Sequence, residues 1–273
     1  MRKLIGVVAP ASRLDASIAE QVRETARTVE GEPEVFFHPQ CFLSSGHFAG
    51  DDEARARAFL DVANDPNFDA LWIGRGGYGS GRIAGEVLAG LNAAAHGKLY
   101  LGYSDAGAIL AGLYRHGFRV AHGPMPADIL RQGGEEAVKR SLAYLVNGAP
   151  ETVEPSVQHG ALYAAFNLTM FSHLLGTALE PDLTGHVLML EDVSEHMYRI
   201  DRAMLHVTGT PSVRKIAGLR LGRVSDVLPN EPDFGLDEEA VVKHWCEKAG
   251  IAYLGRADIG HDAANKIVPF GRY

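Results

Sequence analysis

The turn Gly102-Tyr103-Ser104-Asp105 contains the serine of this sequence that is best placed to act as a nucleophile. It follows an apolar run at 98–102, which is typical of a buried strand, and precedes helical spacing at 106–116. A serine on a sharp strand-to-helix turn is exposed at the edge of a sheet, where N–H groups at the helix start can stabilise an oxyanion. The G-x-S-x-G signature is incomplete, because Ala106 stands in place of its second glycine. A helix cap is therefore an alternative role for Ser104.

A serine nucleophile needs a general base, which is usually a histidine. Among 12 histidines, His261 is favoured because it lies in a polar, glycine-containing loop after an apolar run at 252–256. Glu191 and Asp192 end another apolar run, at 186–190, where an acid that orients the base would project. The alternatives are a solvated histidine, an exposed glutamate and an aspartate that caps the next segment. The order serine, acid, base does not decide between them, because triads are recognised by geometry.

The segment Gly74-Arg75-Gly76-Gly77-Tyr78-Gly79 matches G-x-G-x-x-G between a predicted strand at 69–73 and a predicted helix at 82–91. A dinucleotide site needs an acidic residue about 20 positions further on, and Leu99 stands there. Asp105 comes about six positions late by this rule, so an NAD-binding oxidoreductase is a remote alternative. Glycine-rich backbone also suits close approach to a substrate, with N–H groups pointing at it.

The first half of the chain alternates short apolar runs with helical patterns. Strands are predicted at 4–9, 35–37, 69–73, 98–102 and 118–121, and helices at 15–29, 51–63, 82–91, 106–116 and 135–146. This alternation predicts βαβ units and a parallel sheet, whose sites form at the carboxyl ends of the strands. Both glycine-containing turns fall at that edge.

The pattern changes at 150–160, where two prolines and Gly160 interrupt it. We therefore predict an N-terminal α/β domain at 1–155 that carries the nucleophile, and a C-terminal domain at 160–273 that carries the acid and the base. In the second domain, helices are predicted at 168–175, 200–207 and 238–249, and strands at 186–190, 216–222 and 252–256.

Composition limits the classes of partner and compartment. The 273 residues are 46% apolar and 22% charged, as in ordinary globular proteins, and the net charge of -8 argues against nucleic-acid or anionic-membrane partners. Cys41 and Cys246 form no CxxC pair and suggest no zinc site. A single disulfide between them is an alternative, but a reducing compartment is the simpler interpretation. The apolar run at 4–9 is shorter than the roughly 7–15 residues of a signal-peptide core, and no stretch approaches the roughly 20 that span a membrane. We expect a cytoplasmic protein without a membrane span.

Together these segments resemble the LD-carboxypeptidase family, which includes muramoyl-tetrapeptide carboxypeptidases and microcin C self-immunity peptidases. The resemblance covers nearly the whole chain and rests on the order and spacing of its motifs. The motifs are Ile5-Gly6-Val7-Val8-Ala9-Pro10-Ala11-Ser12, Arg75-Gly76-Gly77-Tyr78-Gly79, Gly102-Tyr103-Ser104-Asp105, His122-Gly123-Pro124-Met125, Asn167-Leu168-Thr169, Leu190-Glu191-Asp192 with Tyr198-Arg199-Ile200-Asp201-Arg202, Gly260-His261 with Asn265, and Pro269-Phe270-Gly271.

The resemblance implies a fold and a set of site residues. The fold is a Rossmann-like N-terminal parallel-sheet domain with a smaller C-terminal α/β domain. The implied catalytic residues are Ser104 as nucleophile, Glu191 as acid and His261 as base, and the implied oxyanion hole is formed by the backbone N–H groups of Gly77 and Asp105.

The resemblance also implies an activity: a serine carboxypeptidase that hydrolyses the L,D amide bond and so releases the terminal D-alanine of murein tetrapeptides during peptidoglycan recycling. Arg75 and Tyr78 are candidates for substrate contacts, although Arg75 could equally brace its loop. Neither a metal nor an organic cofactor is expected, and a homodimer is. The alternative substrate, from the immunity-peptidase branch, is an acyl-sulfamoyl adenylate.

Overall fold

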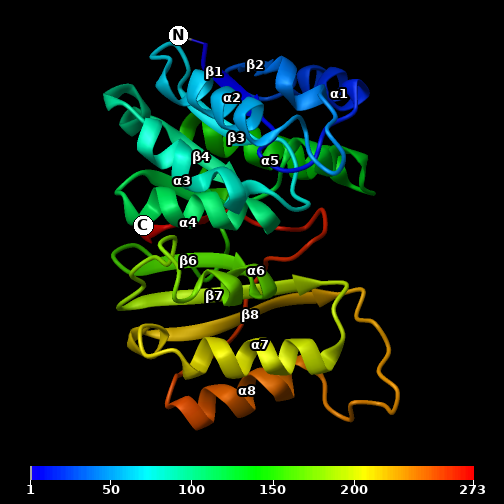
Figure 1. Cartoon of the computed structure of the whole chain (residues 1–273), viewed down its shortest axis with the longest axis vertical. Coiled ribbons are helices and arrows are strands. Elements are labelled where there is room, and N and C mark those ends of the chain that lie inside the picture. The colour runs from blue at the N-terminus through cyan, green and yellow to red at the C-terminus, as the bar shows by residue number, and fades with distance from the viewer. Residues whose placement is uncertain (1) are drawn as a thin grey trace.

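The computed structural model describes residues 2–273, which form two α/β bodies placed one above the other along the long axis (Figure 1). The first half of the chain supplies most of a six-stranded sheet, and the second half supplies a five-stranded sheet. The predicted fold class, an N-terminal parallel-sheet domain with a smaller C-terminal α/β domain, is confirmed.

The N-terminal sheet is parallel except at one edge. Its strand order is β10-β5-β4-β3-β1-β2, with β1 Leu4–Val8, β2 Glu34–Phe37, β3 Ala70–Ile73, β4 Leu99–Gly102, β5 Arg119–His122 and the antiparallel β10 Val268–Pro269. The predicted strands at 4–9, 35–37, 69–73, 98–102 and 118–121 therefore exist with small shifts in their ends.

Helices cover both faces of this sheet, as the alternation of strand side chains requires. Leu71 and Tyr100 point into one core and their neighbours Trp72 and Leu101 into the other. The second core is closed by α1 Ala16–Ala26 and α5 Gly134–Asn147, and the first by α2 Asp52–Asn64, α3 Ser80–Gly90 and α4 Gly107–Arg115.

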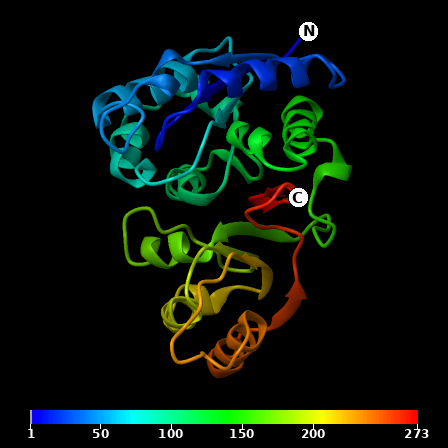
Figure 2. The ribbon, with the colours of Figure 1, turned by 90° about the vertical axis from the view of Figure 1, so that its right-hand side faces the viewer.

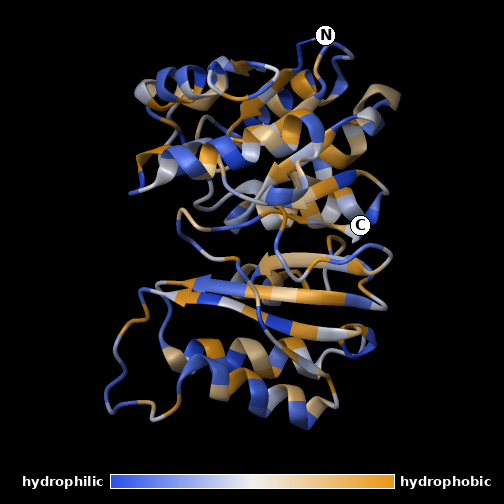
Figure 3. Cartoon of the chain, turned by 180° about the vertical axis from the view of Figure 1, so that it is seen from behind, coloured by the Kyte–Doolittle hydropathy of each residue, from blue (hydrophilic) through white to orange (hydrophobic). Residues whose placement is uncertain are grey.

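The C-terminal sheet has the order β11-β6-β7-β8-β9, and its four longer strands are parallel. They are β6 Leu162–Asn167, β7 His186–Val193, β8 Gly218–Ser225 and β9 Tyr253–Arg256, with β11 Gly271–Arg272 antiparallel at the edge. The helices α6 Leu168–Leu174, α7 Met197–Gly209 and α8 Glu238–Ala249 pack on one face. In Figure 3 the long strands are mostly hydrophobic, with hydrophilic bands at their ends and within them.

The strand β6 is missing from the sequence-based prediction. Its central residues Ala164 and Ala165 have low strand propensity, so the segment shows little β pattern. Both alanines are buried, because β6 lies between β7 and β11 and is covered on both faces. The packing of the sheet, and not local preference, decides this strand.

The C-terminal segment joins the two bodies, and Figure 2 shows it in red between them. Val268 and Pro269 pair with β5 of the first sheet, and two residues later Gly271 and Arg272 pair with β6 of the second. The boundary between 155 and 160 stays a prediction. Among residues 2–273, no helix combines the length and the apolar character needed to cross a bilayer.

Candidate active site

Ser104 stands just beyond the carboxyl end of β4, at the first position of a short 3-10 helix, Ser104–Ala106. Its φ of 60° lies in the left-handed region, which a non-glycine residue adopts only where surrounding structure enforces it. A Cβ built on Gly76 would lie 2.9 Å from the Ser104 Oγ, so the hydroxyl approaches the glycine-rich backbone closely. Within residues 2–273 the Ser104 hydroxyl caps neither this 3-10 helix nor α4, so the cap interpretation gains no support.

The cap in this region is Asp105, and it caps a different helix. Its buried carboxylate accepts hydrogen bonds from the N–H groups of Gly79 (3.2 Å) and Ser80 (2.9 Å), at the start of α3. Burial raises the pKa of this carboxyl, and these hydrogen bonds oppose the rise. Asp105 thereby ties the turn after β3 to the turn after β4.

Gly77 occupies a backbone conformation that only glycine adopts easily, with φ at 114°. A Cβ there would also stand 2.2 Å from the Oγ of Ser12, in the loop that follows β1. Neither the Gly77 nor the Asp105 N–H donates a hydrogen bond to any other described residue. Both donors are therefore unoccupied. Asp105 is the next residue after Ser104, and Gly77 follows Gly76, which approaches the Ser104 hydroxyl. An oxyanion hole needs unoccupied donors of this kind.

The His261 imidazole and the Glu191 carboxylate form a buried pair, with Nδ1 and Oε2 2.5 Å apart. Glu191 is fully buried on β7, which excludes the alternative of an exposed acid. Glu191 pairs in register with Asn167 on β6. On the other side, a Cβ added to Gly222 of β8 would lie 2.8 Å from the Cβ of Glu191, so glycine leaves the space that Glu191 occupies. Burial, the largest single influence, disfavours the imidazolium, but the charge and the hydrogen bond of Glu191, together with the charges of Asp192 and Asp128, outweigh it and raise the pKa of His261.

Asp192, the neighbour of Glu191, has a structural role. Its buried carboxylate accepts hydrogen bonds from the Asn167 side chain (2.8 Å) and from the N–H (3.1 Å) and hydroxyl (2.8 Å) of Thr169. Asp192 therefore holds the start of α6. The alternative from the sequence, that Asp192 caps the segment after β7, is not what the structure shows. This bond network fixes the end of the strand that carries Glu191.

The loop that carries His261 is held by the N-terminal body. The Asn265 Oδ1 accepts a hydrogen bond from the Gly260 N–H (3.2 Å) and lies 3.1 Å from the Nε2 of His122. The Arg140 guanidinium donates to the carbonyls of Ala263 and Asn265, both at 2.9 Å. His122 and Asn265 occur in the motifs of the resemblance, whereas Arg140 gives no sequence signal.

Tyr103 connects the nucleophile turn to the base loop. Its ring lies 4.9 Å from the His261 ring, centroid to centroid, and its hydroxyl donates to Asp128 at 2.9 Å. Arg131 and the Met125 N–H also bind the Asp128 carboxylate, each at 2.8 Å. Sequence reasoning missed Asp128, because a buried aspartate in a loop looks like any turn residue.

The two residues predicted to contact substrate are both exposed. Arg75 donates to the Arg13 carbonyl at 3.3 Å, which fits the loop-bracing alternative without excluding a substrate contact. Tyr78 is 59% exposed and lies beside the rings of His47 and Phe48, at 6.3 and 6.2 Å. Their contacts with substrate stay predictions. No group of three or more His, Cys, Asp or Glu residues in the described part of the chain could hold a metal.

Comparisons with protein families assign both halves of the chain to one kind of enzyme. Residues 5–123 match the LD-carboxypeptidase N-terminal domain, and residues 160–273 match the LD-carboxypeptidase C-terminal domain. A Synechocystis sp. protein named as a carboxypeptidase is 31% identical over 87% of this chain and 79% of its own length. The murein tetrapeptide carboxypeptidase of Pseudomonas aeruginosa is 27% identical over 98% of this chain and 91% of its own length.

Solved structures share the fold. The muramoyltetrapeptide carboxypeptidase from Oxalobacter formigenes superposes with a TM-score of 0.81 at 24% identity, covering 98% of this chain and 93% of that one. The wild-type apo form of the microcin C7 self immunity protein MccF gives a TM-score of 0.78 at 15% identity, covering 98% and 91%.

Proposed function

Because the chain belongs to the LD-carboxypeptidase family, we propose that it releases the terminal D-alanine from murein tetrapeptides by hydrolysing an L,D amide bond. In this proposal Ser104 is the nucleophile, His261 the base and Glu191 the acid. The observation that carries it is the buried 2.5 Å contact between His261 and Glu191, in a loop that adjoins the Ser104 turn through Tyr103. The Pseudomonas aeruginosa relative supports the murein substrate.

The proposed reaction begins when the Ser104 hydroxyl attacks the carbonyl of the scissile amide. The Nε2 of His261 takes the hydroxyl proton, because Nδ1 is already occupied by Glu191. Glu191 thereby holds the required tautomer and stabilises the imidazolium that forms.

The negative charge that develops on the carbonyl oxygen is stabilised by the N–H groups of Gly77 and Asp105, at about 3–4 kcal/mol per donor. His261 then gives its proton to the departing amine of D-alanine, which leaves Ser104 acylated. A water molecule, deprotonated by the same imidazole, hydrolyses the ester and restores the serine.

The decisive experiment compares wild type with Ser104→Ala on L-Ala-γ-D-Glu-mesoDAP-D-Ala, with free D-alanine followed by mass spectrometry. We expect release by wild type and none above background by the variant. The matched control is Ser17→Ala, which removes a hydroxyl from an exposed position of α1. Unchanged release by Ser104→Ala would refute the assignment, and a fluorophosphonate should label wild type but not this variant.

The alternative substrate is tested in the same assay. The MccF likeness concerns the fold at 15% identity and does not favour an acyl-sulfamoyl adenylate over the murein peptide. Turnover of an aspartyl-sulfamoyl adenosine, with none of the tetrapeptide, would transfer the proposal to that substrate while keeping the same triad.

We further propose that the enzyme is a cytoplasmic homodimer. The buried, unbridged thiols of Cys41 and Cys246 support a reducing compartment, and the family resemblance supports the dimer. Fractionation of the cells that express it tests the first expectation. Light scattering coupled to size-exclusion chromatography tests the second, since a monomeric mass at micromolar concentration would contradict it.

A further inference from the structure

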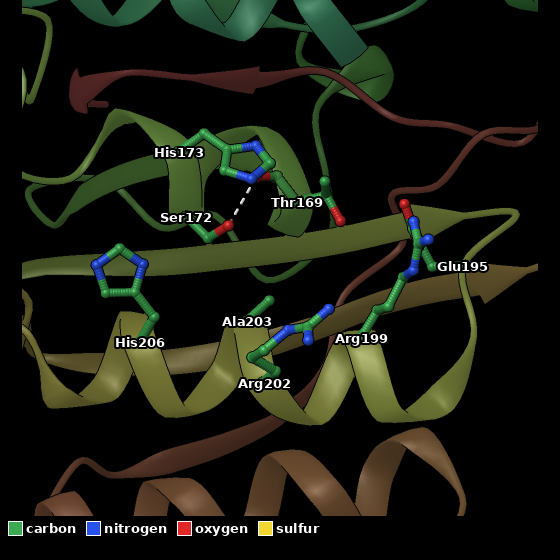
Figure 4. Close-up of a pocket in the computed structure, with 8 residues that line it drawn as sticks. All are labelled: Thr169, Ser172, His173, Glu195, Arg199, Arg202, Ala203 and His206. Carbon is green, nitrogen blue, oxygen red and sulfur yellow. Dashed lines mark hydrogen bonds and ion pairs between the residues drawn. The ribbon is translucent and has the colours of Figure 1, made fainter.

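A pocket of about 360 Å³ opens between α6 and α7 on the C-terminal body (Figure 4). Its walls come from matching faces of the two helices. Thr169 and His173 stand four residues apart on α6, and Arg199, Arg202 and His206 stand three and four apart on α7. Residues with these spacings share one helix face, so the pocket is a groove with basic side chains along it.

The groove carries an arginine that finds no anionic partner in the protein. Arg202 makes no ion pair or hydrogen bond within residues 2–273, and its guanidinium lies 5.6 Å from the Tyr198 ring. Arg199, by contrast, pairs with Glu195 at 3.4 Å. Arg202 is exposed beside this pocket, so its guanidinium is available to an anionic ligand that enters the groove. The planar fork of arginine matches a carboxylate.

The groove lies next to the proposed catalytic residues. Thr169, at one end, binds the carboxylate of Asp192, the residue after Glu191. A Cβ built on Gly107, at the start of α4 just after the nucleophile turn, would be 3.5 Å from Met170 on α6. Glu195 lies four residues beyond Glu191, a separation of at most about 13 Å along extended chain.

A separation within this limit leaves room for the part of the substrate that stays on the enzyme. Loss of the terminal D-residue from a tetrapeptide leaves three residues, which extend over about 10 Å. The floor of the groove includes the small side chain of Ala203 and the arginine methylenes, which can pack against a peptide backbone. A carboxylate on the second residue before the scissile bond would then come within reach of the arginines.

We infer that the α6–α7 groove binds the acyl side of the substrate and that Arg202 pairs with a free carboxylate on it. The inference rests on the proposed function and adds a specificity: the enzyme selects acidic peptides. In the tetrapeptide the matching group is the free carboxylate of the γ-linked D-glutamate.

The test combines two substrates with two enzymes. One substrate is L-Ala-γ-D-Glu-mesoDAP-D-Ala, and the other carries a carboxamide in place of the D-glutamate carboxylate. We expect wild type to prefer the acid by about fivefold in kcat/KM, the effect of one exposed charged pair, and Arg202→Gln to show no preference. The loss should appear in KM, because the contact lies away from the reacting atoms. Arg57→Gln, which removes an exposed guanidinium from α2, is the matched control.

A second variant tests the groove by filling it. Ala203→Phe leaves all charges in place and should raise KM for both substrates. An unchanged preference for the acid in Arg202→Gln, or an unchanged KM in Ala203→Phe, would overturn the inference. The proposed function would still stand in that case, provided that wild type cleaves the tetrapeptide. Failure of wild type to cleave either peptide would overturn both. A dimer whose interface covers α6 and α7, detected by loss of dimer mass in Arg202→Gln, would also overturn it.

Discussion

The ring of Tyr103 lies against the imidazole of His261, with centroids 4.9 Å apart and planes inclined at 54°. Tyr103 is the residue before Ser104, and its hydroxyl is held by Asp128 at 2.9 Å. The residue that precedes the proposed nucleophile thus also supports the proposed base. The position of Tyr103 is held by the buried Asp128 carboxylate, which also accepts hydrogen bonds from the Met125 N–H and the Arg131 guanidinium.

This contact predicts different effects for two substitutions of Tyr103. Tyr103→Phe keeps the ring and should leave kcat within about threefold, whereas Tyr103→Leu removes the support of the imidazole and should lower kcat by about 10- to 100-fold. The acid limb of the pH–rate profile should shift in the leucine variant only, which a purely structural defect would not cause. Equal kcat and identical pH profiles for the two variants would contradict a positioning role.

The His261–Glu191 pair predicts the pH dependence of activity. The base must be neutral to accept a proton. Burial lowers the pKa of His261, but Glu191, helped by Asp192 and Asp128, raises it by more, so that it lies above the ordinary 6.5. The value of kcat/KM should therefore fall as the pH drops through this raised pKa, which lies above 6.5.

Glu191→Gln provides the contrast, since it removes the charge that stabilises the imidazolium. It should shift the acid limb to lower pH and reduce kcat by about 10³- to 10⁴-fold, because the tautomer is no longer held. A profile with the wild-type acid limb would show that Glu191 does not act on His261.

Replacing Gly77 should weaken stabilisation of the transition state. Gly77→Ala forces a side chain into a position 2.2 Å from the Ser12 hydroxyl at a φ of 114°, so the N–H must move. We expect kcat to fall by about 10²- to 10³-fold with little change in KM, as for the loss of one oxyanion donor.

The control for this variant is Gly85→Ala, in the exposed middle of α3, where a Cβ meets nothing within 4 Å. It should retain wild-type kcat and raise the free energy of unfolding by about 0.5–1 kcal/mol, since alanine favours a helix over glycine. Wild-type kcat in Gly77→Ala as well would argue against an oxyanion role for its N–H.

The buried His122 should make the stability of the N-terminal body depend on pH. Burial lowers its pKa from 6.5 to about 3, and the hydrogen bond to Asn265 only partly opposes this. Between these values the unfolded chain binds a proton that the folded chain does not, so the free energy of unfolding should fall as the pH is lowered from 6.5 towards 3.

His122→Gln keeps a donor for Asn265 but has no proton to gain. Its unfolding free energy should therefore depend less on pH in this range than that of wild type, as measured by denaturant titration at several pH values. Parallel pH dependences would show that His122 titrates normally in the folded protein.

Much of the fold follows from local pattern. The apolar runs that become β1, β3 and β4 are short and continuous, which is typical of strands buried on both faces, and glycine-containing turns follow β3 and β4. Their alternation with helical spacing is sufficient to predict a parallel sheet with its turns at one edge. The strand β6 escapes this reasoning, because its alanines become a strand only when the neighbouring strands and helices bury them.

The sequence by itself determined which groups are available for chemistry. They are a serine on a tight turn, an acid at a strand end, a histidine in a late loop, and glycines where the backbone must approach a substrate closely. Only the tertiary structure decided that Glu191 is buried and bonded to His261, and that the base loop is held by His122 and Arg140. The physical reason is range. A turn or a strand depends on a few neighbouring residues, whereas the contact of Tyr103 with His261 joins segments more than 150 positions apart. Such contacts form only when both sheets have packed.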